Sequence, residues 1–143
     1  MRRLLLAAAV TLGAVTYAPG VAGAPRTTPA VGGILRVEDN TVLARLDLPA
    51  LANLGGYLHV ADSLLTSLNL PALTSVAGFN LEQNETLAAL GLPALRTVDG
   101  DIRVYNNAEL ATCQARAVVD RLVAAGWTGD AIISGNNDAG TCP

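Results

Sequence analysis

The chain has 143 residues, of which 51% are hydrophobic, 15% are charged and 3% are aromatic. This apolar fraction excludes an intrinsically disordered chain, and the length suits one domain with a targeting segment. The nine basic residues are all arginines spread along the chain, against twelve acidic residues, for a formal net charge of −3. Without a basic tract, nucleic acid is not an expected partner, and without lysine there is no P-loop or Schiff-base chemistry.

Residues 1–24 have the three-part layout of a secretory signal peptide. Two arginines precede an apolar run from Leu4 to Val15, and small residues follow. That run of about 12 residues is too short to cross a bilayer, which needs roughly 20. We therefore expect residues 25–30 to form a short linker in a mature protein that is secreted or held in the cell envelope without a transmembrane segment.

The middle of the chain contains a repeat of 22 residues. The unit L-x-x-L-x-L-P-A-L occurs at 43–51, 65–73 and 87–95, and a turn with glycine follows each copy. The alternation of apolar and polar residues predicts short strands with every second side chain inward. Proline cannot donate to a strand ladder, so each copy is expected to end its strand at a corner. One such coil cannot be stable alone and needs neighbours to pack against.

A second motif, L-x-V-x-x-N-x-x-L, lies between the copies of the first. It is clearest at 35–43 and 102–110. Its asparagines, Asn40, Asn84 and Asn107, recur where the chain must turn. Asparagine side chains bond neighbouring backbone groups at bends, so we expect them to stack as structural corners.

Together these motifs resemble the receptor L domain, a relative of leucine-rich repeats, over residues 31–143. The resemblance implies a mainly β fold, a right-handed parallel β-helix, and the repeats of this chain give it only about four coils over 31–112. It also implies an extracellular setting and a binding role with a cell-surface protein or glycan as partner.

Residues 113–143 are expected to cap the solenoid. Apolar side chains recur at helical spacing over 114–124, and residues 131–133 suit one last strand. Cys113 and Cys142 are predicted to form a disulfide, because an oxidising compartment pairs two cysteines. They cannot form a zinc site with the single distant His59, and we expect no metal or other cofactor.

One outward column of the repeat is a candidate ligand-binding face. The middle position of each L-x-V strand places one side chain per coil about 4.8 Å from the next. Its bases and the tyrosines beside it could bind an anionic or sugar ligand; equally, outward positions of any solenoid are polar, and pairs such as Arg36 with Glu38 could simply offset one another. The face comprises Arg36, His59, Asn80, Arg103, Tyr57 and Tyr105.

Three functions follow, in order of support. The first is a non-enzymatic binding module of receptor L-domain type. The second is a structural or envelope-assembly protein that associates with itself through the edge of its first coil. The third, a β-helix enzyme acting on polysaccharides, is disfavoured because the few coils offer little groove and no carboxylate pair is well placed.

Overall fold

The computed structural model describes residues 11–12 and 30–142. The signal peptide predicted at 1–24 and the linker at 25–30 lie outside this range except for residues 11, 12 and 30. No helix in the described part is both long and apolar enough to cross a membrane. In chain order the elements are β1 (Thr11–Leu12), β2 (Ala30–Val31), β3 (Leu35–Glu38), β4 (Arg45–Asp47), β5 (Asn53–Ala61), β6 (Ser67–Asn69), β7 (Ser75–Glu82), β8 (Ala89–Gly91), β9 (Thr97–Val98), β10 (Ile102–Tyr105), α1 (Thr112–Ala124) and β11 (Ala131–Ser134).

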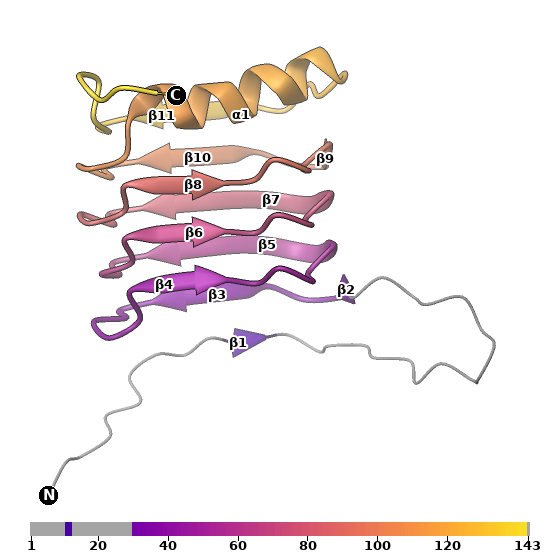
Figure 1. The fold of residues 1–143 in the computed structure, drawn as a ribbon. Coiled ribbons are helices and arrows are strands. Elements are labelled where there is room, and N and C mark those ends of the chain that lie inside the picture. Colours follow the sequence, from indigo (N-terminus) through magenta and orange to yellow (C-terminus); the bar gives the residue numbers. More distant parts are fainter. Residues whose placement is uncertain (1–10, 13–29, 143) are drawn as a thin grey trace, which may run out of the picture.

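The strands form two sheets that face each other across a thin core (Figure 1). The larger sheet has the order β1-β3-β5-β7-β10-β11, with β2 beside β5 and β9 beside β7; the smaller one is β4-β6-β8. The pairings are parallel apart from that of β1 with β3. Each turn of the chain adds a strand to each sheet, which confirms the predicted β-solenoid, with about three turns.

The core consists of stacked side chains, mostly aliphatic with Phe79 among them, whose register is interrupted by one shift between Leu54 and Tyr57 of β5. Leu46, Leu68 and Leu90 lie side by side in the smaller sheet. In the larger sheet Leu35 pairs with Leu58, and the stack continues in the next coils. The buried positions alternate along β3 and β10, as the sequence predicts. Because every coil contributes a buried apolar side chain at the same place, such as Phe79 and Ile102 after Leu58, each layer packs on the next and the coils stabilise one another.

Each turn passes two kinds of corner. At one, Pro49, Pro71 and Pro93 stand two residues beyond β4, β6 and β8, so each proline follows the end of a strand. At the other, the residue after the strand has a positive φ, between 47° and 56°. This left-handed conformation turns the chain sharply without glycine. The residues concerned are Asp39, Asp62, Gln83 and Asn106.

Asparagine side chains are stacked inside this second corner. Asn84 Nδ2 donates to the carbonyl oxygen of Val60 at 3.0 Å, and Asn107 Nδ2 donates to that of Leu81 at 2.9 Å. In both cases the acceptor belongs to the preceding coil. Asn136, which the sequence did not single out as a corner, continues the ladder by donating to Val104 O at 2.8 Å. In the second coil Ser63 takes the place of asparagine, and its N–H donates to Asn84 Oδ1.

The C-terminal end of the stack is closed by α1 and β11 (Figure 1). The disulfide between Cys113 and Cys142 is present, with the two Cα atoms 6.1 Å apart. Cys113 occupies the repeat position of Leu90, but there the chain is helical, so α1 replaces a fourth strand of the smaller sheet. This is why about four coils were expected and about three complete turns are found. β11 nevertheless extends the larger sheet beyond residue 112 by pairing with β10.

Candidate binding site on the strand face

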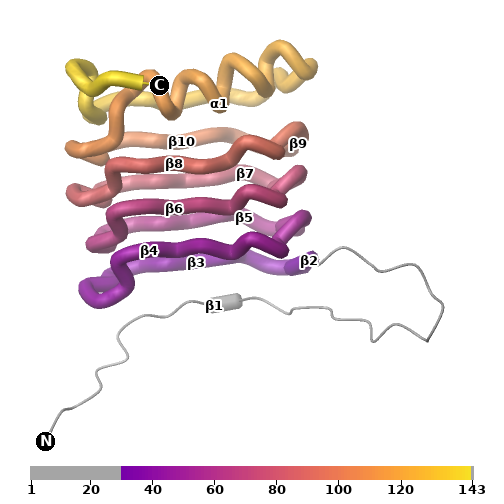
Figure 2. Tube along the Cα trace, viewed as in Figure 1, coloured from indigo at the N-terminus to yellow at the C-terminus, as the bar shows by residue number. Residues whose placement is uncertain are grey.

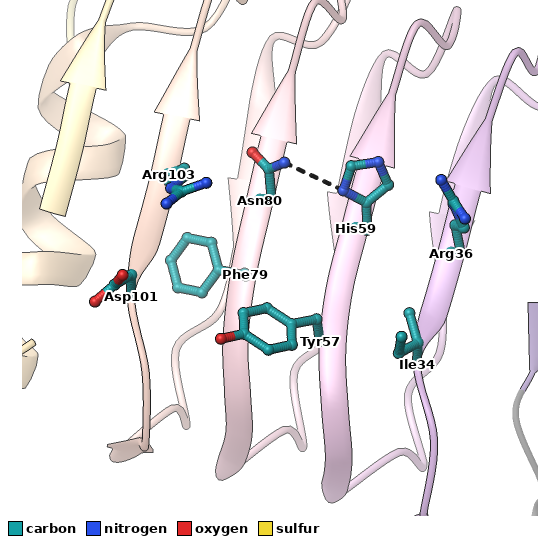
Figure 3. A pocket seen from close by; sticks show the side chains of 8 residues that line it. All are labelled: Ile34, Arg36, Tyr57, His59, Phe79, Asn80, Asp101 and Arg103. Carbon is teal, nitrogen blue, oxygen red and sulfur yellow. Dashed lines mark hydrogen bonds between the residues drawn. The ribbon is translucent and has the colours of Figure 1, made fainter. Parts of the chain in front are cut away.

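A hollow of about 350 Å³ lies on the outer face of the larger sheet (Figure 3). Side chains from β3, β5, β7 and β10 line it, together with residues just before β3 and β10. The hollow coincides with the face that the sequence singles out, because its residues stand side by side in the sheet register. The lining residues are Ile34, Arg36, Tyr57, His59, Phe79, Asn80, Asp101 and Arg103.

Five polar side chains form a connected chain across β3, β5 and β7. Glu38 Oε1 accepts hydrogen bonds from Arg36 and from His59 Nε2, the latter at 2.7 Å. On the other side of the ring, Asn80 Nδ2 lies 3.2 Å from His59 Nδ1 and donates to Glu82 Oε1 at 3.1 Å. The histidine is therefore fixed from both sides by neighbours one coil before and one coil after it.

These contacts assign the tautomer of His59. The amide nitrogen of Asn80 is a donor, so His59 Nδ1 accepts its hydrogen bond. The ring proton then lies on Nε2, which donates to Glu38. Asn80 Oδ1 is buried and has no hydrogen-bond partner among the described residues. Both ring nitrogens of His59 thus bond to neighbouring side chains of the protein. The ring is therefore a fixed, half-buried part of the wall of the hollow.

Arg36 and His59 together perturb the carboxyl group of Glu38. The hydrogen bond from Arg36 is the largest influence that lowers the pKa of Glu38 below its usual 4.5, and the bond from His59 adds to it. Both stabilise the carboxylate, outweighing the opposing effect of partial burial. Glu38 is consequently ionised, and its carboxylate forms an ion pair with the guanidinium of Arg36 at this end of the face.

Arg103, at the other end, is a free cation. Its side chain is exposed, and it forms no ion pair or hydrogen bond with any residue in the described ranges. Asp101 lies two residues earlier, at the rim (Figure 3). Its Oδ1 already accepts the backbone N–H of Asp130 at 3.2 Å. Of the two arginines on this face, Arg103 is the one whose guanidinium is available to a ligand.

Tyr57 forms the floor of the hollow on its other side. Its ring extends from β5 across Gly78 of β7, with which it is paired in register, and its hydroxyl reaches Gly100. A Cβ at Gly100 would lie 2.9 Å from Tyr57 Oη, and a Cβ at Gly78 would collide with the ring. The two glycines therefore form a shelf on which the tyrosine lies, with 46% of its surface exposed.

Five of the six residues of the predicted face line the hollow, together with three residues that the sequence did not single out. Arg36, His59, Asn80, Arg103 and Tyr57 all line the hollow, whereas Tyr105 lies outside it, aligned with Glu82. Phe79 was missed because it points into the core and is 1% exposed, so it contributes only from below. Ile34 and Asp101 precede their strands, outside the L-x-V pattern, although both stand in the residues that lead from a glycine turn into a strand.

The site offers ion pairing, hydrogen bonding and stacking. Within residues 11–12 and 30–142, no group of three or more His, Cys, Asp or Glu side chains is arranged to hold a metal ion. Asp138 Oδ1 accepts a hydrogen bond from Thr112 Oγ1 at 2.6 Å. Both cysteines are joined in the disulfide.

No protein-family model, curated protein or solved structure matches this chain. What the hollow binds therefore has to be inferred from its own geometry and chemistry.

Proposed function

We propose that this chain is a secreted or cell-surface binding module without catalytic activity, and that the strand-face hollow holds a sugar residue bearing a carboxylate. The observation that carries the proposal is that a half-exposed aromatic ring and a guanidinium without a partner in the described part of the chain line the same hollow. Tyr57 provides the ring and Arg103 the charge, on strands β5 and β10 of the same sheet face.

The aromatic part suits a saccharide. A tyrosine ring presents a flat apolar surface with a polar tip, and the apolar face of a pyranose can lie against it. Around Tyr57 the wall consists of hydrogen-bonding side chains, which can meet the hydroxyl groups at the ring's edge. Because Gly78 and Gly100 hold the tyrosine flat on the sheet, its exposed face is arranged before any ligand arrives.

The charge of the ligand follows from the two arginines. Arg36 is already paired with Glu38, while Arg103 is exposed and free of partners among the described residues. A guanidinium recognises a carboxylate through two parallel hydrogen bonds, which adds direction as well as charge. An acidic sugar can satisfy both requirements of the site, with its ring over Tyr57 and its carboxylate on Arg103.

The receptor L domain is the family we propose for this chain. It is supported by the parallel β-solenoid and by the asparagine that stands three residues beyond three of the four strand cores, as Asn40, Asn84 and Asn107. Such a membership would fit an extracellular location and a binding role, which the residues 1–24 and the Cys113–Cys142 disulfide favour independently.

The test is binding of short oligosaccharides to the full chain, collected after export. Oligogalacturonate supplies the carboxylate, and a neutral oligogalactoside of equal length is the comparison. We expect calorimetry to detect the acidic sugar only, and Tyr57→Ala and Arg103→Ala each to weaken it at least about tenfold. Arg116→Ala, at an exposed arginine of α1, is the matched control and should leave affinity unchanged. Equal affinity in all four proteins would exclude this face as the site.

A further inference from the structure

The two ends of the solenoid differ in whether other elements cover the terminal coil. At the C-terminal end α1 and β11 cover the last coil. At the other end the first coil, which includes β3 and β4, has no coil before it among the described residues (Figure 2). Two large apolar side chains of this coil are exposed, Ile34 at 48% and Val42 at 81%. An edge of this kind presents unpaired backbone groups to any strand that can reach it.

The first coil is nevertheless built as if a neighbour preceded it. Asn40 is 1% exposed, and its Nδ2 has no hydrogen-bond partner among the described residues. In later coils the same amide nitrogen donates to a carbonyl of the preceding coil, as Asn84 does to Val60. A buried donor without a partner is costly, and here it lies on the side where an added strand would stand.

The backbone groups of β3 that face away from β5 can be identified from the register. Glu82 O accepts a hydrogen bond from Asp62 N, so the backbone of Glu82 faces the preceding coil. Glu38 is aligned with Ala61 and thereby with Glu82. Since alternate residues of a strand face the same way, the N–H and C=O groups of Arg36 and Glu38 face the open edge.

The same holds for β4 in the smaller sheet. Asn69 O accepts a hydrogen bond from Leu48 N and so faces the first coil. Asp47 is aligned with Asn69. The backbone groups of Asp47 and Arg45 therefore face the open edge as well. Both sheets of the solenoid end in a strand that can accept another.

The sequences of these two edge strands are self-complementary in an antiparallel arrangement. Each consists of an arginine, an inward aliphatic residue and an acidic residue: Arg36-Val37-Glu38 in β3 and Arg45-Leu46-Asp47 in β4. The aligned triplets of the later coils lack this pattern. They are His59-Val60-Ala61, Asn80-Leu81-Glu82 and Arg103-Val104-Tyr105 in the larger sheet, and Ser67-Leu68-Asn69 and Ala89-Leu90-Gly91 in the smaller one.

A two-fold axis through the centre of each strand makes the complementarity explicit. With Val37 on the axis, Arg36 stands opposite Glu38 of the partner subunit. With Leu46 on the axis, Arg45 stands opposite Asp47 of the partner subunit. Because β3 and β4 are the two sides of one coil, as Figure 2 shows, a single axis can pass through both. The opposed residues are also those whose backbone groups face the edge, so each pair can form main-chain hydrogen bonds.

We infer that this edge is the interface of a head-to-head homodimer in which both sheets continue from one subunit into the other. The occupant of the edge is a second copy of this chain. That β3 accepts an antiparallel strand is visible within the chain itself, since β1 pairs with it, Thr11 opposite Arg36. Removal of residues 1–24 would take β1 away and leave the edge to the second copy. This inference is independent of the sugar-binding proposal.

Charge reversal on β4 tests the interface without touching the strand-face hollow, which lies on the other sheet. Sedimentation velocity on the exported protein is expected to show a dimer at micromolar concentrations. Arg45→Asp places like charges opposite each other twice, and should raise the dimer dissociation constant at least about tenfold. The double variant Arg45→Asp/Asp47→Arg restores opposite charges and should restore the dimer. Arg116→Asp, an exposed reversal on α1, should not affect it.

Several outcomes would overturn the inference. They are a monomer at every concentration, a dimer that Arg45→Asp leaves unchanged, a double variant as weak as the single one, or particles that grow beyond the dimer. Circular dichroism of each variant establishes that the fold is retained. Because Arg45 and Asp47 are exposed, both substitutions should be tolerated.

Discussion

Asn84 and Asn107 lie one above the other inside the solenoid, joined by a double hydrogen bond. Asn107 Oδ1 accepts from the backbone N–H of Asn84 at 3.2 Å and from its Nδ2 at 3.1 Å. Both side chains are fully buried. The pair therefore connects successive coils at the corner, where the strands have ended and sheet hydrogen bonds no longer do so.

Replacing Asn107 by alanine should be among the most destabilising single changes in the chain. It removes, in a buried place, the hydrogen bonds that Leu81 O and the backbone N–H of Asn84 form with Asn107, while Asn84 Nδ2 keeps only its bond to Val60 O. At about 1–3 kcal/mol for each unsatisfied group, we expect a loss of roughly 3–5 kcal/mol in urea unfolding. Asn40→Ala is the control. Its Oδ1 accepts only from Val42 N and Leu43 N, so it should cost about 1–2 kcal/mol. Equal losses of unfolding free energy at the two sites would contradict a stabilising role for the hydrogen bonds between successive asparagines.

Removing the disulfide should loosen the cap more than the coils. The sequence separation of Cys113 and Cys142 is 29, for which the chain-entropy model gives about 3–4 kcal/mol. Cys113→Ser/Cys142→Ser should therefore lower the free energy of unfolding by that order. Hydrogen exchange should accelerate in α1 and β11 while β5 and β7 stay protected. Uniform acceleration of hydrogen exchange throughout the solenoid would show that the disulfide stabilises all the coils and not only the cap.

The lowered pKa of Glu38 predicts a specific loss of stability in acid. A carboxyl whose pKa is lower in the folded than in the unfolded chain stabilises the fold above its usual 4.5, and that contribution disappears as the pH falls through the folded pKa. Glu38→Gln should therefore melt at a lower temperature than the wild type at pH 7 and at nearly the same temperature in strong acid. The exposed Glu109→Gln serves as the control. A gap that stays constant from pH 7 to acid would contradict this account.

Glycine at the left-handed corner should stabilise the chain. Gln83 has φ 53°, a conformation that costs a side-chain-bearing residue about 1–2 kcal/mol and glycine almost nothing. The greater freedom of glycine in the unfolded state offsets about 0.5–1 kcal/mol. Gln83→Gly should thus raise stability by roughly 0.5 kcal/mol in denaturant melts. At Thr86, whose φ is not positive, the same change should destabilise. A destabilised Gln83→Gly protein would indicate that the side chain has a role of its own.

Periodicity in this sequence was sufficient to predict the stack, because each coil repeats inward apolar residues and three of the four corners repeat an asparagine. Leu46, Leu68 and Leu90 align as their spacing requires. The end of the stack was harder. Cys113 stands at the same repeat position, which predicts a strand, yet residues from Thr112 onward favour a helix. Only tertiary packing decides between the strand and the helix. Asn136 was overlooked because the helix separates it from the earlier corners.

The binding face shows the same division. The column from Arg36 to Arg103 follows from strand alternation, which the register preserves. That Tyr57 lies across Gly78 and Gly100 could not be read from the sequence, since it depends on the direction of one side chain over two neighbouring coils. Nor could sequence spacing show that Arg36 is paired with Glu38 while Arg103 has no partner within residues 11–12 and 30–142.

The unequal ends of the solenoid also determine how the molecule would respond to mechanical force. Coils of a solenoid are held by their neighbours, so a chain pulled at its termini unwinds one coil at a time. The first coil has a coil on one side only, and it should detach at the lowest force. The covalent bond between Cys113 and Cys142 keeps the segment between them closed throughout. Stretching would therefore unfold the coils in order from the N-terminal end. The segment between Cys113 and Cys142 would not extend until the disulfide is reduced.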